Sequence, residues 1–368
     1  MKRVLLSLAV LAAASVISAD ASLDATSKAE RRGRSLFVHQ WTAGDRLASG
    51  DGLGPRYNAD SCVACHNQGG LGGGGGIEAN VLRIAAPGGE ADVLHHHGVS
   101  DGYAAWRQQK VLEAMPGNSR NIGSAERRNT PALFGAGVID AIPDEVIAAN
   151  ARSAPSSVRG KVNLDEDGRV LRFGWKGDIA SLEDFVEQAC AMELGLGTVN
   201  HPAPKSPFEQ GDETESAVDM TPEQVVDLVA FVSSLPAPES KVGHPGKEHF
   251  DEVGCNSCHT QDLGPAKGVF SDLAVHDMGA ALAGRGGAYG RSTPAIAAND
   301  NAWRTPPLWG VASSAPYMHD GRARDLYEAI RLHGGQAEQS ARAFGALPAE
   351  KQRELQAFLL TLEAPRVE

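Results

Sequence analysis

The sequence is poor in positive charge, in aromatic residues and in long apolar segments. The formal net charge of −12 argues against nucleic acid as a partner, because phosphate recognition needs an excess of Lys and Arg. The same charge mildly favours a basic docking partner. Beyond the N-terminus, no segment approaches the ~20 consecutive apolar residues of a membrane-spanning helix. No membrane span is therefore expected in the mature chain.

The first 21 residues predict a secretory signal peptide. A basic start at residues 1–3 precedes an apolar run over residues 4–17 and a small-residue cleavage site at residues 19–21. The apolar run is too short to span a bilayer, although a retained N-terminal anchor is the alternative. We expect a mature chain that begins near residue 22 and is soluble in the periplasm.

Four of the five cysteines belong to two copies of the pattern Cys-x-x-Cys-His. This pattern is the attachment signature of c-type haem: two thiols can add to the porphyrin vinyl groups, and the histidine becomes the proximal iron ligand. A lone copy could be a zinc knuckle or a thiol redox site, but two copies that both keep the histidine predict a dihaem cytochrome. Cys190 is left without a partner, so no disulfide framework is expected. The predicted haem-binding residues are Cys62, Cys65 and His66 for haem 1, and Cys255, Cys258 and His259 for haem 2.

Repeated segments predict two related domains. A Gly-x-x-x-Phe pattern precedes each haem motif, at residues 33–37 and 246–250. We expect each to form a helix whose glycine lies at a close helix crossing. Each half also ends in an amphipathic helical pattern, at residues 227–235 and 354–362.

The predicted domain boundary follows the first of these terminal helices. A capping-box pattern at residues 221–224 predicts its start, and Pro236 and Pro238 predict its end. The predicted fold is mainly α, with two cytochrome c-like domains that each wrap one covalent haem. They are residues 22–238, with loop insertions, and residues 239–368. Porphyrin that fills part of each core would suit the low aromatic content of 5%.

Three segments of the first half have the character of insertions: residues 69–76, 95–97 and 153–168. The glycine-rich segment 69–76 predicts a flexible loop or a close backbone approach to haem. The consecutive residues His95, His96 and His97 could bind a metal, but adjacent residues on a regular element cannot all face one ion. We therefore expect them to form an exposed loop.

One correspondence between the halves has no gaps. Trp175-Lys176-Gly177 and His319-Asp320-Gly321 are 144 residues apart (319 − 175), and apolar stretches follow at Leu182 and Leu326. Residues at this spacing are therefore predicted to occupy equivalent positions in the two halves.

The axial ligands decide whether each iron can bind an outside molecule. A helical pattern in the second half ends in His333, and the repeat places Ala189 at the equivalent position. Alanine cannot ligate iron. We therefore predict that haem 2 has His259 and His333 as ligands, and that haem 1 has His66 and an open distal side. The alternative sixth ligands for haem 2 are Met318 and His319.

An open haem needs an acid/base residue to move a proton while the O–O bond of a peroxide breaks. Glu193 follows one helical turn after Ala189 and is the predicted residue. Glu183 and Glu187 are competitors, which we expect to face solvent. Trp175 is predicted to lie between the haems, where an aromatic ring would assist electron transfer; a core tryptophan is the alternative.

The sequence resembles the di-haem oxidoreductase family, a peroxidase-like group related to the bacterial dihaem cytochrome c peroxidases and MauG. The resemblance covers roughly residues 30–362. It implies that Trp175 is the tryptophan between the haems, that Glu193 is the distal glutamate and that His333 is the sixth ligand of haem 2. The segments that carry it are residues 51–62, 172–176, 304–310 and 315–322.

Two departures from the family pattern affect what the resemblance implies. No histidine occurs between Gly98 and His201, so the distal histidine that caps haem 1 in resting peroxidases is missing, and haem 1 is expected to be open without reductive activation. The resemblance also implies a calcium ion between the domains. Ser314 and Pro316 could offer carbonyl ligands, but Gly135 replaces the asparagine ligand, which makes calcium doubtful.

Together these features predict a periplasmic enzyme that reduces hydrogen peroxide at haem 1. Haem 2 would relay electrons from a small periplasmic donor of the cytochrome c or cupredoxin type. One alternative is MauG-like oxidation of a partner protein or an organic substrate. The other is a non-catalytic dihaem electron carrier or a haem-based sensor, which would require both irons to be capped.

Overall fold

The computed structural model describes residues 26–85, 91–115, 124–208, 217–239, 243–285, 289 and 299–365. The predicted signal peptide, residues 1–21, lies outside these ranges. Within them, no helix combines the length and the apolar character needed to cross a membrane.

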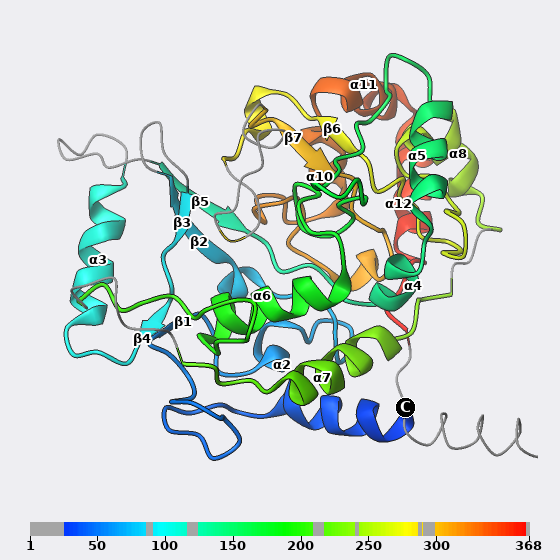
Figure 1. The fold of residues 1–368 in the computed structure, drawn as a ribbon. Coiled ribbons are helices and arrows are strands. Elements are labelled where there is room, and N and C mark those ends of the chain that lie inside the picture. The colour runs from blue at the N-terminus through cyan, green and yellow to red at the C-terminus, as the bar shows by residue number, and fades with distance from the viewer. Residues whose placement is uncertain are drawn as a thin grey trace, which may run out of the picture.

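Helices form most of the regular structure, and long loops and small antiparallel sheets connect them (Figure 1). The helices are residues 26–38, α2 (Cys62–Cys65), α3 (Tyr103–Glu113), α4 (Ala136–Asp140), α5 (Asp144–Ser153), α6 (Leu182–Leu194), α7 (Pro222–Ser234), α8 (Gly246–Glu252), α10 (Leu326–Leu332), α11 (Glu338–Ala346) and α12 (Ala349–Leu359). In the sheets, β1 (Arg56–Tyr57) pairs with β4 (His97–Gly98), β2 (Val81–Ala85) lies between β3 (Ala91–Val93) and β5 (Ser124–Arg128), and β6 (Val275–Asp277) pairs with β7 (Ala302–Arg304).

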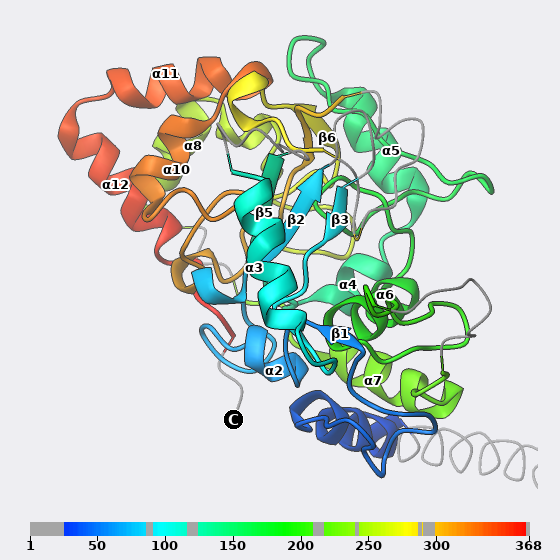
Figure 2. The same ribbon diagram turned by 90° about the vertical axis from the view of Figure 1, so that its left-hand side faces the viewer.

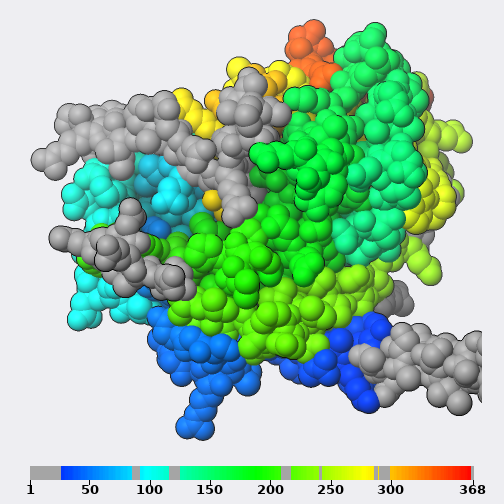
Figure 3. Space-filling model, viewed as in Figure 1, coloured from blue at the N-terminus to red at the C-terminus, as the bar shows by residue number. Residues whose placement is uncertain are grey.

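Most helices of the second half lie apart from the helices around α7, although α5 of the first half also lies in the upper part of the molecule (Figures 1 and 2). α8, α10, α11 and α12 lie together in the upper part, whereas the helix 26–38, α2, α6 and α7 lie in the lower part (Figures 1 and 2). In the space-filling view, residues of about 150–235 form the middle of one face (Figure 3). Segments of the first half therefore cover the interior on this side.

Each half contains two helices that cross at a glycine. A Cβ atom on Gly33 would lie 1.9 Å from the carbonyl oxygen of Asp227 in α7. A Cβ atom on Gly246 would lie 1.9 Å from the carbonyl oxygen of Glu354 in α12. Only glycine allows this approach, so the prediction of a close crossing at both positions is confirmed.

The aromatic packing beside these crossings also repeats. In each half, a phenylalanine from the first helix meets a phenylalanine of the last helix edge-on and lies beside the histidine of the Cys-x-x-Cys-His motif. The ring pairs are Phe37 with Phe231 and His66, at centroid distances of 5.1 and 6.4 Å, and Phe250 with Phe358 and His259, at 5.6 and 6.3 Å.

The gapless correspondence of 144 residues also holds in the structure. α6 and α10 begin at Leu182 and Leu326, and in both the N-cap side chain, Ser181 or Asp325, accepts a hydrogen bond from the backbone N–H of the third helical residue. The turn before each helix is closed by equivalent bridges, Phe173 with Ile179 and Tyr317 with Ala323.

The helix that ends the first half starts and stops as predicted. Thr221 Oγ1 accepts a hydrogen bond from the backbone N–H of Gln224, and Gln224 Oε1 accepts one from the backbone N–H of Thr221, which completes a capping box. α7 ends at Ser234, just before Pro236.

Two apolar clusters form the core. The larger extends from Leu36 to Trp309, and therefore includes residues on both sides of position 238. The smaller lies within residues 250–362, around Phe250, Phe344 and Phe358. Residues of the second half, such as Leu263 and Trp309, thus complete the core of the first.

Replacing Gly246 by Ala should lower the urea midpoint of unfolding, because α8 and α12 would have to separate to admit the methyl group. Overpacking of this kind costs about 1–3 kcal/mol. Gly345→Ala is the matched control: Gly345 lies in α11, and a Cβ atom there would meet no atom within 4 Å. Ala at that position should stabilise the helix by about 0.5–1 kcal/mol. Equal midpoints for the two variants would contradict the crossing.

Candidate functional site

A single cavity joins the two Cys-x-x-Cys-His motifs. It encloses about 3380 Å³ of space, part of which is open to solvent, and residues from both halves line it. The predicted site residues that line it are Cys62, Cys65, His66, Trp175, Glu193, Cys255, Cys258, His259, Met318 and His333.

Three histidines in this cavity share one hydrogen-bonding arrangement. In each, Nδ1 faces a backbone carbonyl oxygen and must donate to it, so Nε2 carries no proton and remains available as a metal ligand. The pairs are His66 with Gly73 at 3.2 Å, His259 with Phe270 at 2.9 Å and His333 with Ala329 at 2.7 Å. Burial lowers the pKa of His66 and of His259 to about 4, and also lowers the pKa of His333. Neutral imidazoles of this kind are the form that binds iron.

His333 and Ala189, which the repeat relates, both line the cavity. His333 follows the last residue of α10 and is close enough to His259 for its charge to lower the pKa of that residue. Ala189 lies on α6 and lines the cavity as well. The first half therefore presents a methyl group at the position where the second half presents an imidazole.

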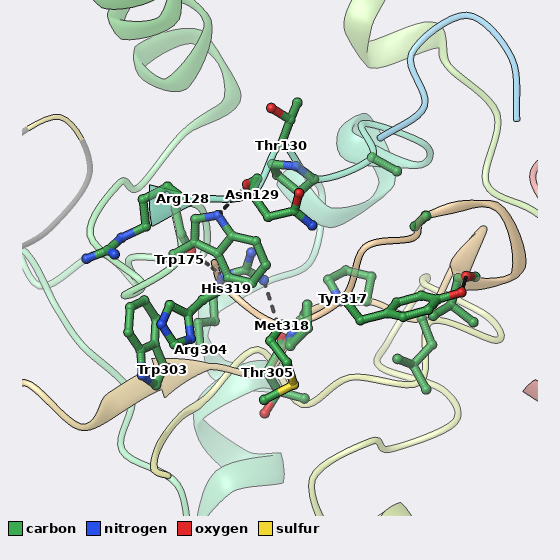
Figure 4. Close-up of a pocket in the computed structure, with 18 of the residues that line it drawn as sticks. Arg128, Asn129, Thr130, Trp175, Trp303, Arg304, Thr305, Tyr317, Met318 and His319 are labelled. Atoms are coloured by element: carbon green, nitrogen blue, oxygen red, sulfur yellow. Dashed lines mark hydrogen bonds between the residues drawn. The ribbon is translucent and has the colours of Figure 1, made fainter. Parts of the chain in front are cut away.

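The two alternative ligands for haem 2 lie in one loop. Met318 has a φ of +71° and occupies the position equivalent to Gly174, whose φ is +78°. The His319 ring stacks on Trp303 with a centroid distance of 3.7 Å and an interplanar angle of 13° (Figure 4). The Trp303 ring therefore covers one face of the His319 ring.

Trp175 lies between the two halves. Its Nε1 donates to the carbonyl oxygen of Asn129 at 2.9 Å, and the backbone N–H of Asn129 donates to the carbonyl oxygen of His319 at 2.7 Å. Figure 4 shows the three residues together. One asparagine backbone thus links the tryptophan of the first half to the loop of the second.

Buried cations also line the cavity. Arg83, Arg128 and Arg304 are well shielded from solvent, and burial lowers the pKa of Arg83 and of Arg304 to about 10. Buried cations need anionic partners. Arg128 has one in Glu126, at 3.2 Å, whereas Arg304 donates to the backbone carbonyl oxygens of Gly174 and Thr305. Each haem carries two propionate groups, so this lining suits two haems, as do the paired thiols and the neutral histidines.

Glu193 is a half-buried residue near the end of α6, and its carboxyl is enclosed by the walls of the cavity. Asn58 Nδ2 donates to its Oε2 at 2.6 Å, and the Tyr289 hydroxyl also hydrogen-bonds to it. Burial raises the pKa of Glu193 to about 7, although both hydrogen bonds oppose this shift. The charge of Glu193 also helps to raise the pKa of Cys65, which places the carboxyl near the first haem motif.

Sequence reasoning gave no role to Asn58 or Tyr289. Asn58 lies in the segment 51–62 that resembles the family, and its place before Cys62 was the only signal. Tyr289 belongs to no motif and lies far from Glu193 in the sequence. Both residues meet the carboxyl only through long-range contacts.

Two of the predicted exposures are wrong. Glu183 is exposed as expected, but Glu187 is buried, where its Oε2 accepts a hydrogen bond from Asn200 Nδ2 at 2.8 Å. His95 is fully buried rather than part of an exposed loop, because its Nε2 lies 2.8 Å from the carbonyl oxygen of Met192 in α6. Only His97 of the three histidines is exposed.

The asparagine that meets the predicted calcium-binding loop is Asn129, and not a residue at position 135. Asn129 Nδ2 lies 2.6 Å from the carbonyl oxygen of Pro316, and its Oδ1 is buried without a partner. Gly135 instead lies against the ring of Trp309. Gly135 therefore removes no side chain from this loop. The expectation that Gly135 takes the place of an asparagine calcium ligand is wrong, because Asn129 occupies that place.

Residues 197–362 match the profile of a protein family described as "Di-haem oxidoreductase, putative peroxidase". This chain is related to the di-haem oxidoreductases. The matched segment contains the second Cys-x-x-Cys-His motif, His333 and the loop around Pro316, whereas the first motif precedes it.

Curated relatives match a smaller part of the chain. The "Methylamine utilization protein MauG" of Methylorubrum extorquens is 33% identical over 137 residues, which cover 34% of this chain and 36% of that protein. The "Hydrazine synthase subunit gamma" of Kuenenia stuttgartiensis is 31% identical over 111 residues, which cover 23% and 31%. The chain thus spans about a third of the length of each.

Solved structures show a low likeness. Kuenenia stuttgartiensis hydrazine synthase has a TM-score of 0.37 at 18% identity, with 64% of this chain and 73% of that chain covered. A MauG-like protein associated with microbial copper homeostasis has a TM-score of 0.34 at 18% identity, with 62% and 91% covered. Likeness at this level says nothing about the reaction.

Glu193 should titrate near pH 7, because its burial disfavours the charged form. The infrared band of its protonated carboxyl should disappear with that midpoint and be absent from Glu193→Gln. The unfolded chain ionises this group near pH 4.5, so its contribution to stability should fall as the pH rises from 4.5 to 7. Glu183→Gln, at an exposed carboxyl of the same helix, is the control. A midpoint near 4.5 would contradict the buried environment.

Proposed function

We propose that this chain is a periplasmic dihaem c-type cytochrome that reduces hydrogen peroxide at an open haem 1. Electrons would enter from a small periplasmic donor and pass through haem 2. The observation that carries the proposal is the asymmetry of the cavity. His333 lies close to His259 of the second haem motif, whereas the acid Glu193 lies close to Cys65 of the first, and the position equivalent to His333 is Ala189, which also lines the cavity.

The lining of the cavity supports the two haems. Cys62 and Cys65 would hold haem 1, with His66 as its proximal ligand; Cys255 and Cys258 would hold haem 2, between His259 and His333. The repeated helix crossings and phenylalanine pairs support a cytochrome c-like unit in each half, with the boundary proposed after residue 238. The signal peptide that the sequence predicts at residues 1–21 supports export, and export suits covalent haem, which is attached outside the cytoplasm.

The protein side of the mechanism is binding, proton handling and electron passage. The bound haem supplies the redox chemistry when it is present. Ala189 leaves room for a small ligand above His66. Glu193, with a pKa of about 7, can hold a proton at neutral pH and also release it, which is the property that a general acid/base residue needs.

The contact between the halves suits electron passage. Trp175 is hydrogen-bonded to the backbone of Asn129, which is bonded in turn to His319. These bonds fix the aromatic ring at the junction of the halves. We propose that Trp175 is the aromatic group through which electrons pass between the haems.

The resemblance to MauG favours a second candidate, the oxidation of a partner protein or an organic substrate by the same dihaem site. Both functions would use the same open haem, the same acid and the same tryptophan. They differ in the molecule that supplies the electrons: a donor protein in the first, and the oxidised partner or organic substrate in the second. Turnover of peroxide with a reduced donor protein supports the first candidate, whereas peroxide consumption only in the presence of an oxidisable partner supports the second.

The two irons should differ in spin state. A pyridine haemochrome assay should give two covalent haems per chain, and electron paramagnetic resonance of the oxidised protein should show one low-spin and one high-spin signal. The low-spin signal would come from haem 2, which His259 and His333 would hold, and the high-spin signal from haem 1, for which His66 would be the protein ligand. Two low-spin signals would favour the electron carrier instead.

His333→Ala should convert the low-spin signal to high spin, because it removes the sixth ligand of haem 2. Cyanide binding at haem 1, followed in the Soret band, should remain. His319→Ala is the control, because His319 belongs to the alternative loop and stacks on Trp303. If a Met318 variant loses the low-spin signal and His333→Ala keeps it, the sixth ligand of haem 2 is Met318 and not His333.

Glu193→Gln should keep both haems and lower peroxide turnover by about 10²-fold or more, because the amide cannot transfer a proton. Glu187→Gln is the control, since Glu187 is buried on the same helix but does not line the cavity. Unchanged turnover in Glu193→Gln would move the acid/base role to another residue.

A further inference from the structure

Asn58 joins the segment before the first haem motif to the end of α6. Its backbone N–H donates to the carbonyl oxygen of Glu193 at 2.7 Å, and its side-chain Nδ2 donates to Glu193 Oε2 at 2.6 Å. Asn58 is only 7% exposed, so water competes weakly for these bonds. One residue therefore holds both the backbone and the carboxyl of Glu193.

The orientation of the Asn58 amide is fixed by a second contact. The backbone N–H of His96 donates to Asn58 Oδ1 at 3.0 Å. Because a backbone N–H can only donate, the oxygen of the amide must face His96, and the NH₂ group must face Glu193.

The histidine segment is itself held firmly at this place. His95 Nε2 lies 2.8 Å from the carbonyl oxygen of Met192, the neighbour of Glu193 on α6. The carbonyl oxygen of His95 accepts hydrogen bonds from the Tyr103 hydroxyl at 3.0 Å and from Arg107 Nε at 2.8 Å. The position of the His96 N–H therefore does not depend on solvent.

We propose that Asn58 is a positioning residue for Glu193, which keeps Oε2 as a hydrogen-bond acceptor and so places the acidic proton on Oε1. An N–H group that points at Oε2 disfavours a proton on that oxygen, and the carboxyl then presents one defined donor atom to the cavity. Within the part of the chain that the structure describes, the ionisable groups that interact with this carboxyl are the Tyr289 hydroxyl, which hydrogen-bonds to it, and the Cys65 thiol. The inference rests on the proposed role of Glu193 in proton transfer.

The test compares two asparagine-to-aspartate exchanges in the haem-loaded protein. Asn58→Asp keeps an acceptor for the His96 N–H but replaces the donor to Glu193 by a second acid, so one apparent pKa of the pair must rise. The infrared midpoint of Glu193, separated from that of Asp by ¹³C-glutamate labelling, should rise by about one pH unit or more. Asn58→Ala also removes the donor and should shift the midpoint in the same direction.

Asn200→Asp is the matched control, because Asn200 donates to a carboxyl of the same helix, Glu187 Oε2, at 2.8 Å and does not line the cavity. It should leave the Glu193 midpoint unchanged. A Glu193 midpoint that stays the same in both Asn58 variants, with both haems bound, would overturn the inference.

A second readout separates this inference from the proposed function. Cyanide arrives as HCN and needs a base to take its proton, so the pH midpoint of its binding at haem 1 should rise in Asn58→Asp together with the infrared midpoint. If the wild-type protein binds no cyanide, the proposed open haem is wrong, and the infrared titration alone still decides whether Asn58 controls Glu193.

Discussion

The contact of a glycine Cα with a carbonyl oxygen on the facing helix sets the geometry of each half. A larger residue at Gly33 or Gly246 would push the first helix away from the last. The same first helix carries the phenylalanine that lies beside the histidine of the Cys-x-x-Cys-His motif. The crossing therefore fixes the wall against which each histidine ring packs, and the Nδ1–H bond to a backbone carbonyl fixes the direction of Nε2.

The same repeat is used differently in the two halves because the equivalent helices differ in length. α6 has 13 residues and α10 has 7, although both begin at equivalent positions with the same type of cap. α10 ends at Leu332, so His333 is the C-cap, and its ring can bond to the carbonyl of Ala329. α6 continues for six more residues, and this extension carries Glu193 into the reach of Asn58. The equivalent helices thus end differently: α10 is followed by a potential iron ligand, His333, whereas α6 carries an acid, Glu193, in its last turn.

Local and periodic features of the sequence predicted much of this arrangement. The helix crossings, the capping box of α7 and the 144-residue correspondence depend on residues close together in sequence or on an internal repeat, and the structure confirms them. The burial of His95 and Glu187 could not be predicted in this way, because each is buried by a segment distant in sequence. Asn58 and Tyr289 were missed for the same reason. The contact of Asn129 with Pro316 likewise joins segments from opposite halves of the chain.

The two tryptophans at the junction of the halves have unequal electrostatic surroundings. Lys176 Nζ lies 3.7 Å and the Arg128 guanidinium 4.9 Å from the centroid of the Trp303 ring. Burial lowers the pKa of Lys176 to about 7, so the Arg128 guanidinium holds the more persistent charge of the two. Positive charge over a ring stabilises its neutral form and makes loss of an electron harder. The cation–ring contacts of the described residues fall on Trp303 and Tyr327, whereas Trp175 donates its N–H to a backbone carbonyl. The electrostatics therefore make an electron easier to remove from the Trp175 ring than from the Trp303 ring, which supports the role proposed for Trp175 in electron passage.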